Sequence, residues 1–102
     1  MGLMSRSPFA WEIQVRREVL DDEMARLRDI PYSFWRTVLG KPSSKMVTAR
    51  DDKPYRLRVT ADLAQDGSED IHVTLSLTRA SMIRRGPLRQ VFTITRENTF
   101  RV

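Results

Sequence analysis

The side chains best suited to proton transfer are one histidine and several carboxylates. His72 is the only histidine in the chain, and imidazole is the side chain that most often serves as a general acid or base near neutral pH. It stands between Ile71 and Val73 in a strand-like segment, far in sequence from any candidate nucleophile. We therefore interpret His72 as a solvated residue on the outward side of a strand.

The carboxylates occur in three groups, each with a structural explanation. They are Asp21-Asp22-Glu23, Asp51-Asp52, and the set Asp66, Glu69 and Asp70. The first group suits the start of a helix, where the helix dipole favours negative charge. The second suits a hairpin loop and the third a turn, because aspartate bonds to nearby backbone N–H groups. The third group also lacks the spacing of an EF-hand calcium loop.

The chain has no motif of the common enzyme classes. It has no cysteine, which excludes thiol nucleophiles, thiolate zinc sites and disulfides. Its four glycines are isolated from one another, so neither a P-loop nor a dinucleotide-binding loop can form, and there is no Gly-x-Ser-x-Gly elbow. We therefore expect a protein that is not an enzyme, with no cofactor and no metal site. The sequence identifies no small-molecule substrate.

Positive charge is concentrated at the end of the sequence. Residues 1–78 hold twelve basic and twelve acidic side chains, whereas residues 79–102 hold six arginines and the single acid Glu97. This asymmetry indicates an anionic partner. The candidate partner-binding residues are Arg79, Met82, Ile83, Arg84, Arg85 and Arg89. The alternative is compositional, since fifteen arginines against three lysines is a bias that GC-rich coding produces without selection for binding.

Two functions follow from this distribution. The first is an interaction or accessory module that binds a protein partner or a second copy of itself, because arginine beside apolar residues is enriched at interfaces. The alternative is sequence-independent binding of a nucleic-acid backbone by the same basic C-terminal region, together with Arg50, Arg56 and Arg58 on an outward sheet face lined by hydroxyls. That face carries no aromatic residue on which a base could stack.

The first ordered segment, residues 9–16, alternates between apolar and polar residues. Phe9, Trp11, Ile13 and Val15 fall on one side of an extended chain, which favours an N-terminal strand. The alternative is a helix that begins at Ser7-Pro8, but Trp11 and Val15 would then lie opposite Phe9 and Ile13. Residues 1–7 are expected to be disordered.

Two helices are expected next. Leu20, Met24, Leu27 and Ile30 share one helical stripe, which Pro31 closes. A short helix from Tyr32 to Leu39 follows and ends at Gly40.

The remaining sequence predicts a meander of four strands, at 45–50, 55–63, 71–78 and 88–96. In the first hairpin, a three-residue loop at 51–53 would pair Ala49 with Tyr55 and Val47 with Leu57. Phe100-Arg-Val102 either folds back or frays.

These elements predict one α+β domain over residues 1–102, with an N-terminal strand, two helices and an antiparallel meander, the helices packed on one sheet face. The predicted core is Leu20, Met24, Leu27, Trp35, Leu57, Val59, Ile71, Val73, Leu75, Leu77, Phe92 and Ile94. No segment is apolar enough to span a membrane, and residues 1–8 lack the apolar stretch of a signal peptide. We expect a cytoplasmic protein.

Several motifs resemble a family of small bacterial proteins of unknown activity. These motifs are Pro31-Tyr32, Leu39-Gly40, the hairpin Arg50-Asp-Asp-Lys-Pro-Tyr55, and Phe92-Thr-Ile with Phe100. The resemblance spans residues 18–100 and implies a bacterial origin and the same order of helices followed by a meander. Asp52 stands where such hairpins carry glycine. The resemblance implies no activity and assigns no functional residue.

Overall fold

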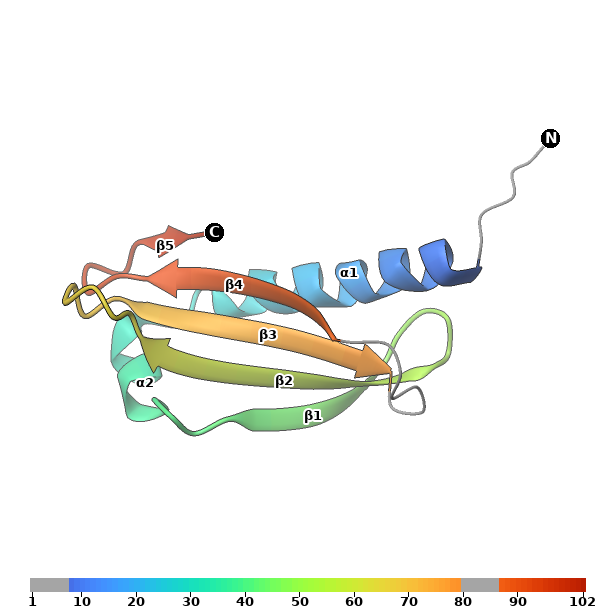
Figure 1. Ribbon diagram of the computed structural model, residues 1–102, viewed down its shortest axis with the longest axis horizontal. Coiled ribbons are helices and arrows are strands. Elements are labelled where there is room, and N and C mark those ends of the chain that lie inside the picture. Colours follow the sequence, from blue (N-terminus) through green and yellow to red (C-terminus); the bar gives the residue numbers. More distant parts are fainter. Residues whose placement is uncertain (1–7, 80–86) are drawn as a thin grey trace.

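A five-stranded antiparallel sheet carries two helices on one of its faces (Figure 1). The computed structural model describes residues 8–79 and 87–102. The helices are α1 (Pro8–Leu27) and α2 (Tyr32–Thr37), and the strands are β1 (Ser43–Thr48), β2 (Pro54–Leu63), β3 (Ile71–Arg79), β4 (Leu88–Ile94) and β5 (Phe100–Arg101). Each strand pairs with the next in the order β1-β2-β3-β4-β5. The α+β class and the antiparallel meander are confirmed, and β5 adds a fifth strand because the end of the chain folds back onto β4.

The N-terminal strand predicted for residues 9–16 is wrong, because these residues form the first half of α1. Buried positions along α1 recur at helical spacing, and three of them are charged residues, Glu12, Arg16 and Glu23. Trp11, by contrast, is 39% exposed. The helical period is not visible in the sequence because polar residues occupy buried positions and an apolar residue occupies an exposed one. The remaining alternation of apolar and polar residues is typical of a strand.

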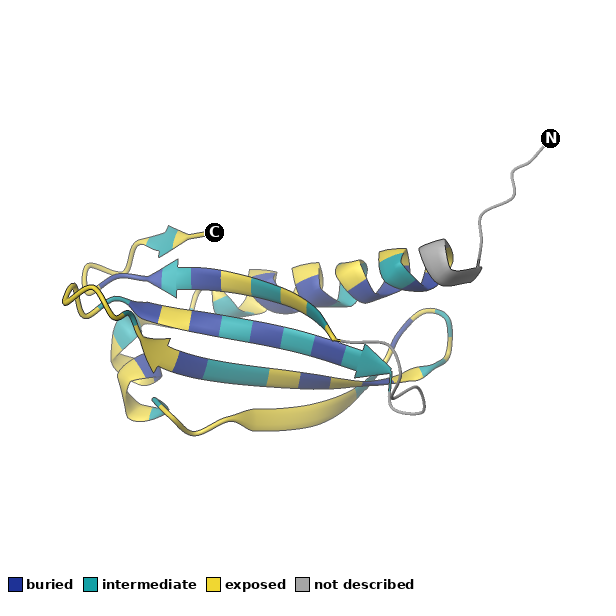
Figure 2. Ribbon diagram, in the orientation of Figure 1, coloured by how far each residue is buried: buried dark blue, intermediate teal, exposed yellow. Residues whose placement is uncertain are grey.

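The core lies between the helices and the inner sheet face, which faces α1 and α2 (Figure 2). Of the predicted core residues only Leu27 and Val59 are partly buried, and both pack against the cluster. Four further residues complete it: Val15, Ala49, Tyr55 and Ala61. Trp35 joins the two layers through an edge-on contact with Phe92, at 5.9 Å between ring centroids. Among the described residues, no helix is long and apolar enough to cross a membrane.

The first hairpin has a loop of the predicted length but a shifted register. Val47 pairs with Tyr55, and Lys45 pairs with Leu57. Ala49 donates its N–H to the Lys53 carbonyl (3.2 Å), which closes a three-residue loop at 50–52 instead of 51–53. Asp52 takes the left-handed conformation (φ 61°) that such loops require at their last position. Because of this conformation, the loop begins one residue earlier than predicted. The residue of β2 that pairs with each residue of β1 therefore changes by two positions.

α1 packs mainly against β3 and β4, and α2 packs mainly against β3, so the helical layer lies chiefly over the middle of the sheet. Figure 1 shows β1 as the edge strand farthest from α1. β1 is exposed at every position except Val47, which is half-buried. The sheet therefore ends in a strand that the described helices do not cover.

Candidate functional site

The outer sheet face, which points away from the helices, gathers three arginines and a set of hydroxyls. Strand register places Arg58, Ser76 and Arg89 in one row across β2, β3 and β4. Arg56 and Thr78 form the next row. These side chains line a shallow hollow of about 460 Å³ together with Thr60, Thr74 and Pro87. We call this the arginine hollow.

The arginines of the hollow are not neutralised by carboxylates. The guanidinium groups of Arg56, Arg58 and Arg89 form no ion pair or hydrogen bond within the part of the chain that the structure describes. Six other arginines lie within ion-pair distance of a carboxylate. These are Arg16, Arg26, Arg36, Arg50, Arg79 and Arg101. The guanidinium donors of the hollow are therefore available to an external anion.

Acidic residues are concentrated on the opposite layer. α1 contains five acidic and three basic side chains. On the outer face, the described strands place one carboxylate, Asp62, which lies opposite His72 and away from the arginine rows. The two helices together carry five acidic and four basic side chains, so their charges nearly balance. The outer sheet face is the more positive surface, which attracts an approaching polyanion toward the sheet.

The structure brings together only some of the predicted binding residues. Arg56, Arg58 and Arg89 share the arginine hollow. Arg79 lies on the inner face instead, where its Nη1 donates to Glu12 Oε2 (2.9 Å). Met82, Ile83, Arg84 and Arg85 fall outside the described residues. Because Arg79 and Arg89 lie on opposite faces of the sheet, the predicted C-terminal set does not form one continuous patch.

Arg50 does not belong to the outer face either. Its Nε and Nη2 donate to the two carboxylate oxygens of Glu18 in α1, at 2.6 and 3.0 Å. Its guanidinium also lies over the Trp11 ring, 4.5 Å from the centroid. The bonded arginine lowers the pKa of the Glu18 carboxyl. Arg50 therefore joins the loop between β1 and β2 to α1 and does not contribute a free charge.

A buried charge cluster lies between α1 and the sheet, and sequence reasoning missed it. Glu12 Oε1 lies 3.8 Å from Arg16 Nη2, and Glu12 and Arg16 are 5% and 4% exposed. Tyr55 is buried beside this cluster, and its hydroxyl donates to Asp51 (2.7 Å). Burial, followed by the bond to Asp51, raises the pKa of Tyr55. The i, i+4 spacing of Glu12 and Arg16 was the available sequence signal.

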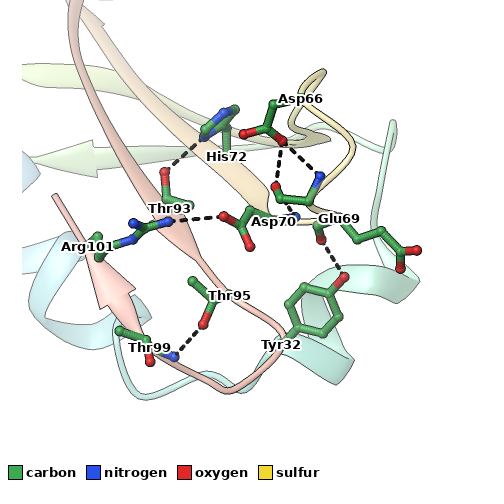
Figure 3. A network of polar contacts seen from close by, with 10 residues as sticks. Tyr32, Asp66, Glu69, Asp70, His72, Thr93, Thr95, Thr99 and Arg101 are labelled. Atoms are coloured by element: carbon green, nitrogen blue, oxygen red, sulfur yellow. Dashed lines mark hydrogen bonds and ion pairs between the residues drawn. The ribbon is translucent and has the colours of Figure 1, made fainter.

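The remaining acid–base candidates form a polar network at the β2–β3 turn (Figure 3). His72 Nδ1 lies 2.9 Å from the Thr93 hydroxyl, and both residues project from the outer face. Asp66 accepts from the hydroxyl and N–H of Ser68, which lowers the pKa of the Asp66 carboxyl.

This network joins the turn to other elements. Arg101 of β5 donates to Asp70 (3.0 Å), and the Tyr32 hydroxyl of α2 donates to the Glu69 carbonyl (2.6 Å). Among the described residues, no three His, Asp or Glu side chains gather as metal ligands. These contacts assign the network a structural role, which is to fix the turn to α2 and β5.

Two hollows lie on the inner face beside β1. One, of about 550 Å³, lies between α1 and β1 and is lined by Val15, Val19 and Val47 among others. The second, of about 400 Å³, lies under α2 against Leu57 and Val59. Glu23 and Lys45 line both hollows and are 3.5 Å apart. These hollows mark where the helical layer ends before it reaches the edge of the sheet.

Comparison of the chain with protein-family models, with curated proteins and with solved structures found no match. The resemblance to a family of small bacterial proteins stays a prediction. The functional conclusion therefore rests on the geometry of this chain.

Proposed function

We propose that this protein is a binding module whose arginine hollow holds the phosphate backbone of nucleic acid without reading its sequence. The observation that carries the proposal is the grouping of Arg56, Arg58 and Arg89 in one hollow, with no carboxylate partner among the described residues. Arginine is suited to this role because its planar fork bonds two phosphate oxygens at once.

The spacing of the arginines suits a ligand with repeated charges. Arg56 and Arg58 are two residues apart on β2, which corresponds to about 6.6 Å along a strand. Arg58 and Arg89 are separated by β3, which corresponds to about 10 Å across the sheet. The hydroxyls of Thr60, Thr74 and Ser76 lie among these charges and supply neutral hydrogen-bond donors.

The composition of the hollow also indicates the kind of recognition. No aromatic residue lines it, so base stacking has no platform there. Contacts from arginines and hydroxyls to phosphates position a nucleic acid but carry no sequence information. We therefore expect single- and double-stranded DNA and RNA to compete for the same face, with affinities that fall as salt rises.

The direct test is fluorescence anisotropy of labelled mixed-sequence DNA and RNA titrated with the protein at low salt. Arg56→Glu combined with Arg58→Glu should weaken binding roughly tenfold or more, because phosphate contacts dominate this kind of affinity. The matched control compares Arg58→Glu alone with Arg17→Glu, an equal charge reversal at an exposed position of α1. Equal losses in the control would show a net-charge effect only and would contradict the assigned face. Tighter binding of polyglutamate than of nucleic acid would instead indicate an acidic protein partner.

A second candidate function is the interaction with a protein partner that the sequence favours. Arg79 does not support it, since that guanidinium is paired with Glu12. The side chains assigned to this function are Met82 and Ile83, which lie outside the described residues. Substitution of both residues by aspartate should abolish capture of a protein partner and leave nucleic-acid binding unchanged. Unchanged capture would contradict this function.

A further inference from the structure

β1 presents an unpaired row of backbone groups at one edge of the sheet. In an antiparallel ladder, alternate residues exchange both bonds with the neighbouring strand. The bond from Ala49 to Lys53 places Ala49, and therefore Val47 and Lys45, among the residues bonded toward β2. The intervening residue Thr48 lies opposite Pro54, which has no N–H to donate. The N–H and C=O groups of Ser44, Met46 and Thr48 consequently point away from the sheet.

This edge has little protection against strand pairing. Sheet edges are commonly guarded by proline, by a bulge, by a lysine or by an inward-pointing charge. No proline lies within β1. Its one charged residue, Lys45, is on the helical side of the sheet, and the Glu23 carboxylate at 3.5 Å offsets its charge. Met46, the central outward residue, is 53% exposed. The opposite edge consists of the two-residue strand β5 and of residues 88–92 of β4, with which β5 does not pair.

We propose that a second copy of the chain pairs with β1 through an antiparallel ladder, with a two-fold axis at Met46. This register sets Met46 opposite Met46 and Ser44 opposite Thr48, so all three outward-facing residues of β1 pair. An axis at Lys45 would pair fewer of these groups and place two lysines opposite each other, which is unfavourable. An axis at Val47 would leave Ser44 outside the strand of the second copy.

Complementary charges and free space beside β1 support a second copy of the chain as the binding partner. If the same pairing is extended beyond the end of β1, Lys41 lies beside the 50–52 loop of the second copy, in which Asp52 is exposed. The two-fold axis repeats this contact, so Lys41 of each copy lies beside the acidic loop of the other copy. On the helical side, Lys45 lies opposite Val47 of the second copy, next to the hollows beside β1. β1 is exposed at every position except Val47, which is half-buried, so the added strand has space.

The pairing would join two outer faces into one surface, a consequence that rests on the proposed function. Arg56 lies opposite Met46 across the β1–β2 ladder. The row across the interface would therefore read Arg56, Met46, Met46, Arg56, and the two arginines would be about 14 Å apart over three strand spacings. A nucleic-acid backbone could then contact both arginine hollows.

Cysteine cross-linking tests the register, because the natural sequence contains no cysteine. A hydrogen-bonded antiparallel pair has its Cα atoms about 5.5 Å apart, within the range of a disulfide. Met46→Cys should give a covalent dimer on mild oxidation. Ser44→Cys alone should remain monomeric on a non-reducing gel, whereas Ser44→Cys with Thr48→Cys should link. Equal linking of the two single variants, or no linking of Met46→Cys, would overturn the proposed register.

Sedimentation of the unmodified protein tests the dimer itself. We expect a dimer, and Met46→Lys should give a folded monomer because two lysines would meet on the axis. Circular dichroism of that variant distinguishes lost pairing from lost folding. A wild-type protein that sediments as a monomer at every concentration would overturn the proposal. Arg56→Glu with Arg58→Glu should leave the dimer intact, so failure of this proposal and failure of nucleic-acid binding are distinguishable.

Discussion

Arg79 near the end of β3 donates a hydrogen bond to Glu12 in the first half of α1, at 2.9 Å and across 67 residues of sequence. Glu12 is 5% exposed, so this contact lies at the boundary of the core and not at the surface. It ties the N-terminal part of α1 to the sheet. It also removes Arg79 from the positive charge that the outer face presents.

Loss of the Glu12 carboxylate should destabilise the protein strongly. Glu12→Gln keeps the shape of the side chain but removes the negative charge that lies beside the guanidinium groups of Arg16 and Arg79. Removal of one partner from a buried ion pair typically costs about 3 kcal/mol. Urea unfolding followed by circular dichroism measures this change in the free energy of unfolding.

The matched control for that variant is Glu18→Gln, which removes the exposed partner of Arg50. Exposed ion pairs contribute less than about 1 kcal/mol, so the control should lose little. If the two substitutions have equal effects, Glu12 is not the buried counter-charge described above.

Stability should fall in alkali because of Tyr55. Its pKa is raised in the folded protein, chiefly by burial, whereas the unfolded chain ionises at the ordinary tyrosine pKa of about 10. Above that pH the unfolded state holds fewer protons than the folded state, so the free energy of unfolding declines as pH rises. The decline should approach 1.4 kcal/mol per pH unit from this group.

Urea unfolding between pH 9 and pH 11 checks the alkaline effect. Tyr55→Phe should be less stable than the natural protein at neutral pH, since the bond to Asp51 is lost, but should have a flatter alkaline profile. Absorbance of tyrosinate gives a second readout, because Tyr55 should resist ionisation until the protein unfolds. A parallel decline in both proteins would contradict the assignment to Tyr55.

The 50–52 loop predicts a stabilising substitution. Asp52 has a φ of 61°, a conformation that glycine adopts without the steric cost of a Cβ atom. Asp52→Gly should therefore raise the free energy of unfolding by about 0.5 kcal/mol, the steric gain being partly offset by the greater freedom of the unfolded chain.

Asp51→Gly provides the contrast in the same loop. Asp51 accepts hydrogen bonds from the Lys53 N–H (3.1 Å) and from the Tyr55 hydroxyl, so its replacement should destabilise the protein. Thermal unfolding of both variants measures whether each substitution raises or lowers the stability of the protein. A loss of stability in Asp52→Gly would show that the Asp52 side chain makes a contribution that its conformation does not explain.

The sheet could be predicted well from sequence because its inner face follows a strict two-residue period. Ile71, Val73, Leu75 and Leu77 are all fully buried, as their alternation indicates. The same period also places Arg79 on the inner side, and Arg89 on the side opposite Phe92. Their closeness in sequence suggested that these two arginines share one patch. The alternation of side chains along each strand instead places them on opposite faces of the sheet.

The first half of α1 could not be predicted in the same way. Its buried face includes Arg16 and Glu12, and Glu12 pairs with Arg79 in β3, which is distant in sequence. The arginine hollow could be predicted only in part, for a similar reason. Arg56 and Arg58 were recognisable as an outward pair, but the arrival of Arg89 beside Ser76 depends on the β3–β4 register.

The most direct test of the arginine hollow is the salt dependence of nucleic-acid binding, measured for the natural protein and for Arg56→Gln, Arg58→Gln and Arg89→Gln. The logarithm of affinity should fall linearly with the logarithm of salt concentration, and each substitution should reduce the slope by roughly a third because each arginine neutralises one phosphate of three. Arg17→Gln should leave the slope unchanged. A slope that none of the three hollow variants alters, or no binding at low salt, would contradict the claim that this face holds a phosphate backbone.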